Sequence, residues 1–498
     1  MTISTAVELS AVARVVGIKT GYVNLRQDGS PQLPQRIAVV GQGSTASTYS
    51  TVKAQVTSAQ QAAEAYGFGS PLHLACLQLF PQNGDGVGSI PVTLYPMVDA
   101  GSAVAAAGDI TPSGTQTAAA SYVIYINRIA SQSFVFAAAA TLADRTLAIT
   151  NAVNGQLALP VTATDNGTDV TITSKWQGLT GNDLEIEIVG GATAGTVFAI
   201  TQPVGGLIDP DVTPALAQIG DVWETLILNC SNMGDTAALT AFNTFGEGRW
   251  GALTRKPCVV FTGSNELSVV TAIAVPEARK TERTNVQLIA PGSKNLPLVI
   301  AAAQLARIAV VANNNPAHDY GSQPVSLITP GTDGQQWTYA QRDQAVKGGS
   351  SSVVVKDGVV NISDVVTFFH PSGDTLPAYR FVVDIIKLQN VIFNLDLVFA
   401  SADWDGAPLI PDDQATSNRS ARKPKAAVAA IAAVVDSLAL EAILSDPAAI
   451  KKTIIAGINA ANPKRLDAAV TVKLSGNAGI ISIDLNFGFY FGAATLVA

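Results

Sequence analysis

Two hydrophobic patterns alternate along this chain, and their order limits the folds it can adopt. From 35 to 98, and again after 206, strand-like runs such as "RIAVVG" and "KPCVVFTG" are separated by helical patterns. This strand–helix–strand order predicts a largely parallel sheet covered by helices. From about Asp99 to Gly206, short strands follow one another, separated by turn sequences such as "DNGTD". That change predicts a β domain inserted into an α/β chain.

The fold class that we expect is therefore α+β or α/β and multidomain. It has a mixed-sheet core, an inserted all-β domain, and a C-terminal α/β domain with terminal arms. The six expected segments are an N-terminal arm (1–34), the first part of the core α/β domain (35–98), the inserted β domain (99–206), the second part of the core domain (207–334), a C-terminal domain (335–485) and a C-terminal strand arm (486–498).

The C-terminal region shows a hairpin, two helices and a final strand. Asp357-Gly358 joins two alternating runs, which is a strong hairpin signal. Helical patterns follow at 379–399 and 425–444, and residues from Ile480 to Gly492 alternate apolar and polar with a period of two. We expect the stretch 468–480 to be able to pair with this last strand through a turn at 475–479. An aromatic strand at an open edge invites another chain to pair with it, so we expect a second subunit to cover it.

Composition favours a subunit of an assembly. Charged residues make up 14% of the 498 residues, against about 25% in typical soluble domains. The net charge is −8 and no long basic run occurs, so general binding to nucleic acid is not expected. The start of the chain lacks a basic signal-peptide region, and three scattered cysteines suit a reducing compartment. The most apolar run, 296–312, contains Gln304 and Arg307 and falls short of an uninterrupted span. We expect a soluble protein made in a cytoplasm and not inserted into a membrane.

No stretch of the sequence predicts an enzyme, a cofactor site or a metal site. The run after "RIAVV", from Gly41 to Ala46, matches a dinucleotide-binding fingerprint, but a β-branched and hydroxyl-rich stretch follows where a helix should begin. His73 and Cys76 lie one helical turn apart, yet a zinc site needs about four ligands. No Gly-x-Ser-x-Gly elbow is present.

One cationic cluster has two open interpretations. Arg419, Arg422, Lys423 and Lys425 occur with no acidic residue between Asp413 and Asp436. Cations at the start of a helix oppose the helix dipole, at a cost of roughly 0.3–1 kcal/mol each. The cluster is either a solvated helix start or a surface that faces an acidic partner.

Several stretches in a fixed order resemble contractile-tail sheath proteins of bacteriophages, most closely those of Mu-like phages. They are "LPQRIAVVGQ", "AYGFGSPLHLACLQLF", "KWQGLTGNDLEIEI", "QRDQAVKGGSSSVVVKDGVVNISDVVTFF" and "NPKRLDAAVTVKLSG". The resemblance implies hexameric rings of this chain, stacked helically around a tail tube, which contract to drive the tube through a host envelope. It implies a virion-tail protein assembled in the bacterial cytoplasm, with tube, baseplate and tail terminator proteins as partners.

The resemblance also implies where the working surfaces lie. In such sheaths the C-terminal domain is innermost, and terminal arms add strands to the sheets of adjacent subunits. On this basis we expect Asn486, Phe487, Phe489 and Phe491 to form an inter-subunit strand arm. We expect the cationic cluster to face the tube. Two alternatives stay open: the sheath of a phage-derived bacteriocin or secretion injector, and, in another class, a Rossmann-type nucleotide-binding enzyme that rests on the Gly41 motif alone.

The inserted segment should fold by itself, because its strand pattern differs from the rest and its borders, such as "DAGSAVAAAG", are rich in Gly and Ala. Expressed alone as residues 99–206, it should give a well-dispersed amide NMR spectrum. A collapsed spectrum would count against a self-contained domain.

Overall fold

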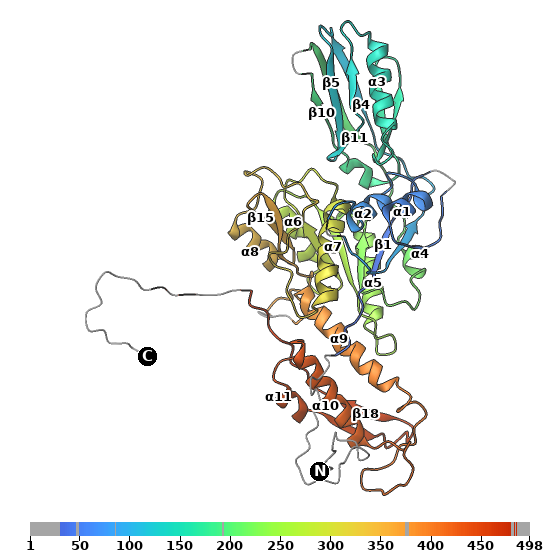
Figure 1. The fold of residues 1–498 in the computed structure, drawn as a ribbon, viewed down its shortest axis with the longest axis vertical. Helices are drawn as coiled ribbons and strands as arrows, with labels where there is room; N and C mark the ends of the chain where they lie inside the picture. Colours follow the sequence, from blue (N-terminus) through green and yellow to red (C-terminus); the bar gives the residue numbers. More distant parts are fainter. Residues whose placement is uncertain are drawn as a thin grey trace, which may run out of the picture. The chain divides into compact units, whose positions relative to one another are not determined.

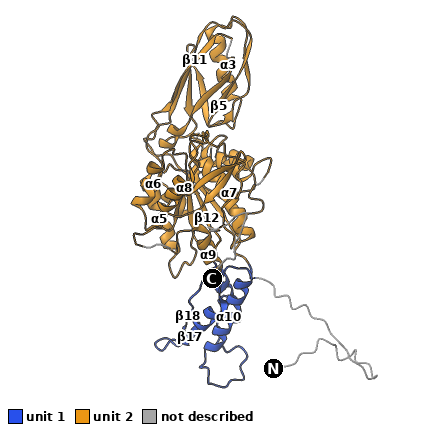
Figure 2. Ribbon diagram, turned by 90° about the vertical axis from the view of Figure 1, so that its left-hand side faces the viewer, with its two compact units in different colours: residues 1–31, 393–475 blue, residues 32–392, 476–498 orange. Residues whose placement is uncertain are grey.

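The computed structural model describes residues 30–45, 49–84, 86–191, 194–373 and 378–479, together with Ile483 and Leu485 (Figure 1). Contacts group them into two compact units (Figure 2). Unit 1 holds 30–31 and Phe393–Ser475, and unit 2 holds Gln32–Ile392 with the described residues from Gly476 onward. This grouping by contacts differs from the six expected segments, whose boundaries stay a prediction.

A six-stranded sheet forms the centre of unit 2, with β1 between β3 and β12. β1 is parallel to both neighbours, β13 and β14 continue the parallel order, and β2 lies antiparallel at the edge beside β3. All residues of the five parallel strands are buried, as expected when helices cover both faces. The predicted, largely parallel sheet is therefore confirmed. In sheet order the strands are β14 (Asn285–Ile289), β13 (Val259–Ser264), β12 (Leu226–Asn229), β1 (Ile37–Gln42), β3 (Val92–Met97) and β2 (Ala54–Val56).

The long apolar helix α7 packs directly on this sheet. A Cβ added at Gly263 of β13 would lie 1.7 Å from the Pro297 carbonyl oxygen, so glycine is what allows the close approach. Among the described helices, α7 is long and apolar enough to span a membrane, but 67% of it is buried inside the protein. It is therefore a core helix of this unit. The helices of unit 2 around the sheet are α1 (Ala59–Tyr66), α2 (Pro71–Leu79), α4 (Thr213–Ala217), α5 (Thr236–Arg249), α6 (Val269–Ala278), α7 (Pro297–Asn314) and α8 (Tyr339–Lys347).

A break divides the helical stretch that the sequence predicts after β2. Helix α1 ends at Tyr66, and α2 begins at Pro71 with Ser70 as its N-cap. Between them Gly67 and Gly69 have φ of +95° and +77°, a region that suits glycine. The prediction of one continuous helix is wrong here, because these glycines end the first helix and a capping serine starts the second.

The inserted segment forms two four-stranded antiparallel sheets and carries one helix. One sheet has the order β11-β4-β9-β8; the other has β10-β5-β6, with β7 also paired to β5. The ring of Tyr122 lies 4.8 Å from that of Phe136 and 5.4 Å from that of Phe198 (centroid distances), so aromatic contacts fill part of this core. The elements are β4 (Ala107–Gly114), β5 (Ala120–Ile126), β6 (Ile129–Ala130), β7 (Phe134–Phe136), α3 (Leu142–Asn154), β8 (Val161–Asp165), β9 (Val170–Ser174), the short 3₁₀ helix η2 (Leu179–Asp183), β10 (Ile186–Gly190) and β11 (Thr196–Val204).

Helix α3 contradicts the expectation of an all-β insertion. It begins with a capping box in which Thr141 and Asp144 satisfy each other's backbone N–H groups, and Gly155 is its C-cap. Ile149 and Val153 are fully buried, so the helix packs on the strands through one face. The capping pattern was visible in the sequence and marks the helix start.

The two ends of the insertion lie side by side and are tied to the core by polar contacts. Val104 and Leu207 exchange two backbone hydrogen bonds of 3.1 Å each. The Asn232 side-chain amide donates to the Asp183 carboxylate at 2.9 Å. Lys294 Nζ lies 3.1 Å from the carboxylates of both Glu185 and Glu187. These contacts fix the insertion at its base.

The hairpin expected at Asp357-Gly358 is confirmed. β15 (Ser352–Lys356) and β16 (Val359–Asp364) pair antiparallel, and both turn residues have positive φ, 51° and 77°. Two positive φ angles characterise the type I′ turn that Asp-Gly favours. Helix α9 (Val382–Phe399) follows, within the first of the two predicted helical stretches.

Unit 1 contains α10 (Pro424–Leu440), α11 (Pro447–Lys452) and an antiparallel hairpin of β17 (Ile455–Ile458) and β18 (Leu466–Ala469). The Asn459 carboxamide oxygen accepts hydrogen bonds from the N–H groups of Ala461 and Asn462, both at 2.9 Å, and so shapes the turn. The first part of the stretch 468–480 belongs to β18, and its pairing with the final strand stays a prediction. That part pairs with β17 because this turn brings the two strands together, and Leu474 bridges to Leu444. The final strand lies outside the described residues except for Ile483 and Leu485.

We expect the base of the insertion to make the stability of the protein depend on pH. Burial raises the pKa of Asp183 to about 6, and the nearby Asp209 carboxylate raises it further, while the bond from Asn232 opposes both. A carboxyl whose folded-state pKa is raised stabilises the fold most below its unfolded pKa, and that stability is lost as the pH rises to about 6. The free energy of unfolding of the parent protein should therefore fall by about 1–2 kcal/mol between pH 4 and 7 because of this carboxyl. In Asp183→Asn this fall should be absent.

The measurement is urea unfolding of both proteins at pH 4, 5, 6 and 7. The exposed Asp165→Asn, at the end of β8, serves as the control and should keep the pH-dependent loss that the parent shows. Parallel pH profiles for Asp183→Asn and the parent would contradict this account.

Candidate assembly surfaces

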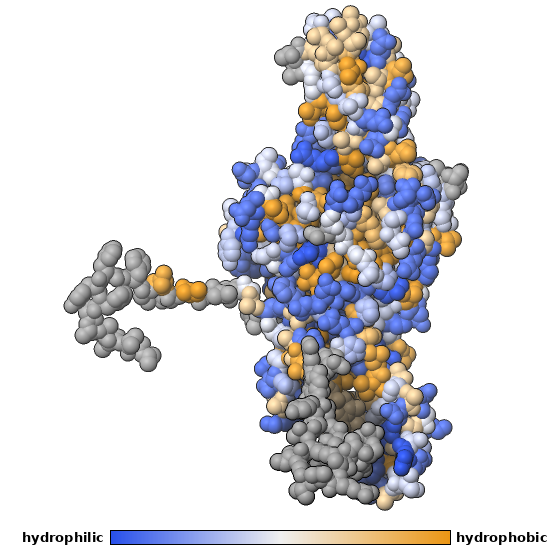
Figure 3. All heavy atoms as spheres, viewed as in Figure 1, coloured by the Kyte–Doolittle hydropathy of each residue, from blue (hydrophilic) through white to orange (hydrophobic). Residues whose placement is uncertain are grey.

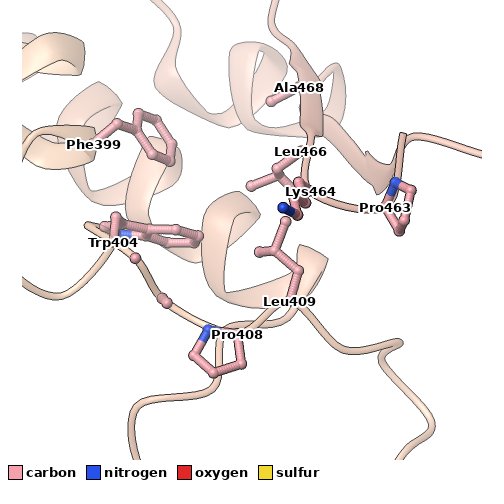
Figure 4. Close-up of a pocket in the computed structure, with 10 residues that line it drawn as sticks. Phe399, Trp404, Pro408, Leu409, Pro463, Lys464, Leu466 and Ala468 are labelled. Carbon is pink, nitrogen blue, oxygen red and sulfur yellow. The ribbon is translucent and has the colours of Figure 1, made fainter. Parts of the chain in front are cut away.

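An apolar groove of about 650 Å³ opens on unit 1, between the loop after α9 and strand β18 (Figure 4). The rings of Phe399 and Trp404 meet edge to face on one side, with their centroids 5.1 Å apart. Leu409 and Leu466 line the opposite side, and the Lys464 amine reaches toward the groove in the close-up. Apolar walls with a cation nearby suit an apolar side chain followed by a polar or acidic group.

The hairpin beside the groove is incomplete as a sheet. β17 and β18 form a sheet of two strands within the described part of the chain, so each has an outer edge without a ladder partner there. A two-stranded hairpin is marginal alone and gains stability from further strands. Leu466 and Ala468, two residues apart on β18, contribute to the groove. A strand added at this edge could therefore place alternate side chains in the groove.

Two exposed apolar residues come directly before the predicted strand arm (486–498). Ile483 is 80% exposed and Leu485 is 78% exposed, and hydrophobic spheres are visible on this stretch (Figure 3). The arm residues Asn486, Phe487, Phe489 and Phe491 lie outside the described residues. In the sequence, Phe487, Phe489 and Phe491 continue the spacing of two that Ile483 and Leu485 begin, the spacing of residues on one face of a strand.

The cationic cluster at the start of α10 is compact and partly neutralised. Arg422 Nη2 lies 2.6 Å from the Asp403 carboxylate, and Lys423 Nζ donates to the backbone oxygens of Asp412 and Gln414. The Asp412 side chain accepts from the Lys425 backbone N–H at 3.0 Å and so caps the helix. Arg419 lies in the exposed loop before the helix.

This geometry corrects one premise of the sequence argument. Asp403 and Asp412 supply, within unit 1, the negative charge and the capping oxygen that the helix start needs. The cost of the cations does not by itself demand an outside partner. Arg419 and the Lys425 side chain are exposed, so they are the cations that a partner could meet. The sequence argument missed these aspartates because Asp403 approaches through the loop that follows α9.

The glycine motif after β1 serves packing. A Cβ at Gly41 would lie 2.9 Å from Cys230 Sγ and 3.3 Å from a methyl of Leu72, so this position of the strand has room only for glycine. The next helix in the described ranges begins at Ala59, well beyond Gly43. A dinucleotide site needs the helix N-terminus directly after the strand, and this arrangement does not provide it.

His73 and Cys76 are core residues on α2. His73 Nδ1 accepts the Gly69 N–H at 2.9 Å, and burial lowers the imidazole pKa to about 4, with a further contribution from Lys175. Burial also raises the pKa of the Cys76 thiol far above its ordinary value. Among the described residues no group of three or more His, Cys, Asp or Glu could hold a metal ion. His73 is therefore a neutral structural side chain.

Comparisons with known proteins give one curated relative and several solved structures. No protein-family model matches the chain. It is 24% identical, over 378 residues, to the tail sheath protein of the Mu-like prophage FluMu of Haemophilus influenzae, and the match covers 72% of this chain and 74% of the relative. Among solved structures, the sheath tail protein of Listeria innocua gives a TM-score of 0.49 at 10% identity, covering 90% of this chain and 94% of that one. The contracted sheath complex of an extracellular contractile injection system gives 0.45 at 10% identity, covering 96% and 99%.

The FluMu match confirms the resemblance to contractile-tail sheath proteins that the sequence motifs indicate. The particular kind that this chain resembles is the sheath of Mu-like phages, which the same motifs also indicated.

Proposed function

We propose that this protein is the structural subunit of a contractile tail sheath. It assembles as hexameric rings stacked around a tail tube, and contraction drives the tube through the host envelope. The observation that supports this most is the similarity to a tail sheath protein over 72% of the chain. The role is structural, and the partners beyond the chain itself are the tube, baseplate and tail terminator proteins. Assembly takes place in the host bacterial cytoplasm.

The linkage between subunits is a strand added to the β17–β18 hairpin. The donor is the arm 486–498 of a neighbouring subunit, and the acceptor is the hairpin edge with its groove. Phe487, Phe489 and Phe491 recur at a spacing of two, the spacing at which β18 presents Leu466 and Ala468 to the groove. Each aromatic side chain that becomes fully buried contributes roughly 1.5–3 kcal/mol, to which main-chain hydrogen bonds add.

Head-to-tail strand addition also explains how copies of the chain would assemble into a polymer. The donor and acceptor are different surfaces of the same chain, so the contact is heterologous and need not close on itself. Repeated contacts then build a helical array around a central axis. In contraction, compact units rotate as bodies while these strand linkages persist.

The cationic cluster faces the tube in this arrangement. It lies in unit 1, within the C-terminal region that the family resemblance places innermost. Arg419 and Lys425 would meet acidic groups of the tube, while Arg422 and Lys423 hold the helix start in shape through Asp403 and the Asp412 and Gln414 carbonyls. Such exposed attractions weaken as salt rises.

Removal of residues 486–498 should abolish sheath formation and leave a folded, soluble monomer, because the donor strand is lost while the core is untouched. Sedimentation and negative-stain microscopy measure the outcome. Leu466→Asp, which places a charge in the acceptor groove, should give the same result.

Val359→Asp, an exposed apolar site on β16 of unit 2, is the matched control and should still polymerise. Normal tubes formed by the truncated protein would show that the arm is dispensable and overturn the linkage. Failure of the full-length chain to polymerise with or without a tube would overturn the sheath assignment itself.

Arg419→Glu combined with Lys425→Glu should weaken assembly on tubes, most strongly at low salt, because the reversed charges repel an acidic surface over a Debye length of roughly 10 Å at 0.1 M. Lys347→Glu with Lys356→Glu makes an equal charge change on unit 2 and should have little effect. Equal assembly of both double variants at all ionic strengths would remove the cluster from the tube interface.

A further inference from the structure

Asn477 lies at the root of the C-terminal arm and makes two side-chain hydrogen bonds to distant parts of unit 2. Its Oδ1 accepts from Lys387 Nζ at 2.6 Å, and its Nδ2 donates to the Ala317 carbonyl oxygen at 2.8 Å. Lys387 belongs to α9, and Ala317 to the loop that follows α7. An exposed residue thus joins two elements that are 90 and 160 positions away in the chain.

The contact with Lys387 matters for stability because this lysine is fully buried and its ammonium group has no access to water. Its exposed fraction is 0%, and its Nζ also lies 3.3 Å from the Asp384 carboxylate one helical turn earlier. A buried ammonium group needs oxygen acceptors to replace its water. Asn477 supplies one of them at a shorter distance than Asp384 does. The lysine therefore holds the Asn477 amide oxygen in place. The backbone around Asn477, which leads to the arm 486–498, is held with it.

The chain is fixed on both sides of Gly476. The Ser475 N–H donates to the Ile443 carbonyl at 3.1 Å within unit 1, whereas Asn477 is held within unit 2. A Cβ added at Gly476 would meet no atom within 4 Å, so the residue between the two fixed points is open. The Gly479 N–H donates to the Asn477 carbonyl at 2.9 Å, so the backbone turns directly after this residue. The exposed Ile483 and Leu485 come next.

We propose that Asn477 is an anchor that fixes the segment of chain leading to the C-terminal arm (486–498), and that this anchoring positions the arm for capture by a neighbouring copy of the chain. The idea deepens the proposed function and rests on it for the role of the arm. A tethered root reduces the conformational freedom that the arm loses on docking, so assembly proceeds at lower protein concentration. Without the anchor, the last fixed point before the arm would be Ser475.

The test uses the full-length protein with Asn477→Leu, which keeps the side-chain size and removes both hydrogen bonds. Hydrogen exchange of the monomer should accelerate about tenfold in the peptide covering 474–479, because the fixed point is lost. The concentration at which sheaths form should rise about tenfold, the effect of one charge-assisted hydrogen bond. Asn477→Asp keeps an oxygen for Lys387 Nζ and should restore the assembly threshold to within about threefold of the parent.

Asn166→Leu, an equal change in an exposed turn of the inserted segment, is the control and should alter neither measurement. Parent-like exchange in Asn477→Leu would overturn the anchor, and faster exchange with an unchanged assembly threshold would overturn its positioning role. If the parent chain forms no sheaths at all, the proposed function fails, and the exchange experiment on the monomer still decides whether Asn477 is an anchor.

Discussion

Strand β1 makes parallel hydrogen bonds to β3 on one side and to β12 on the other, and the whole inserted segment lies between those two strands in the chain. Because β1 can satisfy both of its edges only when β3 and β12 are in place, the central sheet forces the two ends of the insertion together. The Val104–Leu207 bridge is the direct result. The burial of all five parallel strands, the packing of α7 against Gly263 and the fixed base of the insertion follow from this one pairing.

Unit 1 has the opposite character. Its hairpin has two strands, its groove is open beside Trp404, and Ile455 at the start of β17 is 67% exposed. The largest sheet of unit 2 has five fully buried parallel strands, whereas the one sheet of unit 1 among the described residues is a two-stranded hairpin with exposed apolar side chains. This contrast is what a protein needs if one part must stay rigid and another must bind copies of itself. The low charge content of the chain fits the same division.

The parts of the structure that local patterns control were predictable. Asp357-Gly358 adopts the positive φ angles of a tight hairpin. Helix α9 lies within the predicted stretch 379–399, and α10 begins at Pro424, one residue before the predicted stretch 425–444. The errors arose where a short signal was overlooked or where distant residues met. The Thr141–Asp144 capping box is a local helix signal inside a strand-rich region, where the strand pattern dominates the prediction. The partners of the cationic cluster were harder to foresee, because Asp403 reaches Arg422 only through the path of the loop after α9.

The sequence by itself determined the period of each element, the parallel character of the core sheet and the resemblance to tail sheaths, since these depend on residue order and spacing. The tertiary structure decided which residues work together. It shows that Gly41, part of a possible dinucleotide-binding motif in the sequence, packs against Cys230. It also brings Lys387 into contact with Asn477, 90 positions later in the chain. No local pattern predicts such pairings, because a buried lysine and an exposed asparagine carry no shared periodicity. Their contact exists because the fold removes water from the Lys387 amine and leaves the Asn477 oxygen within reach.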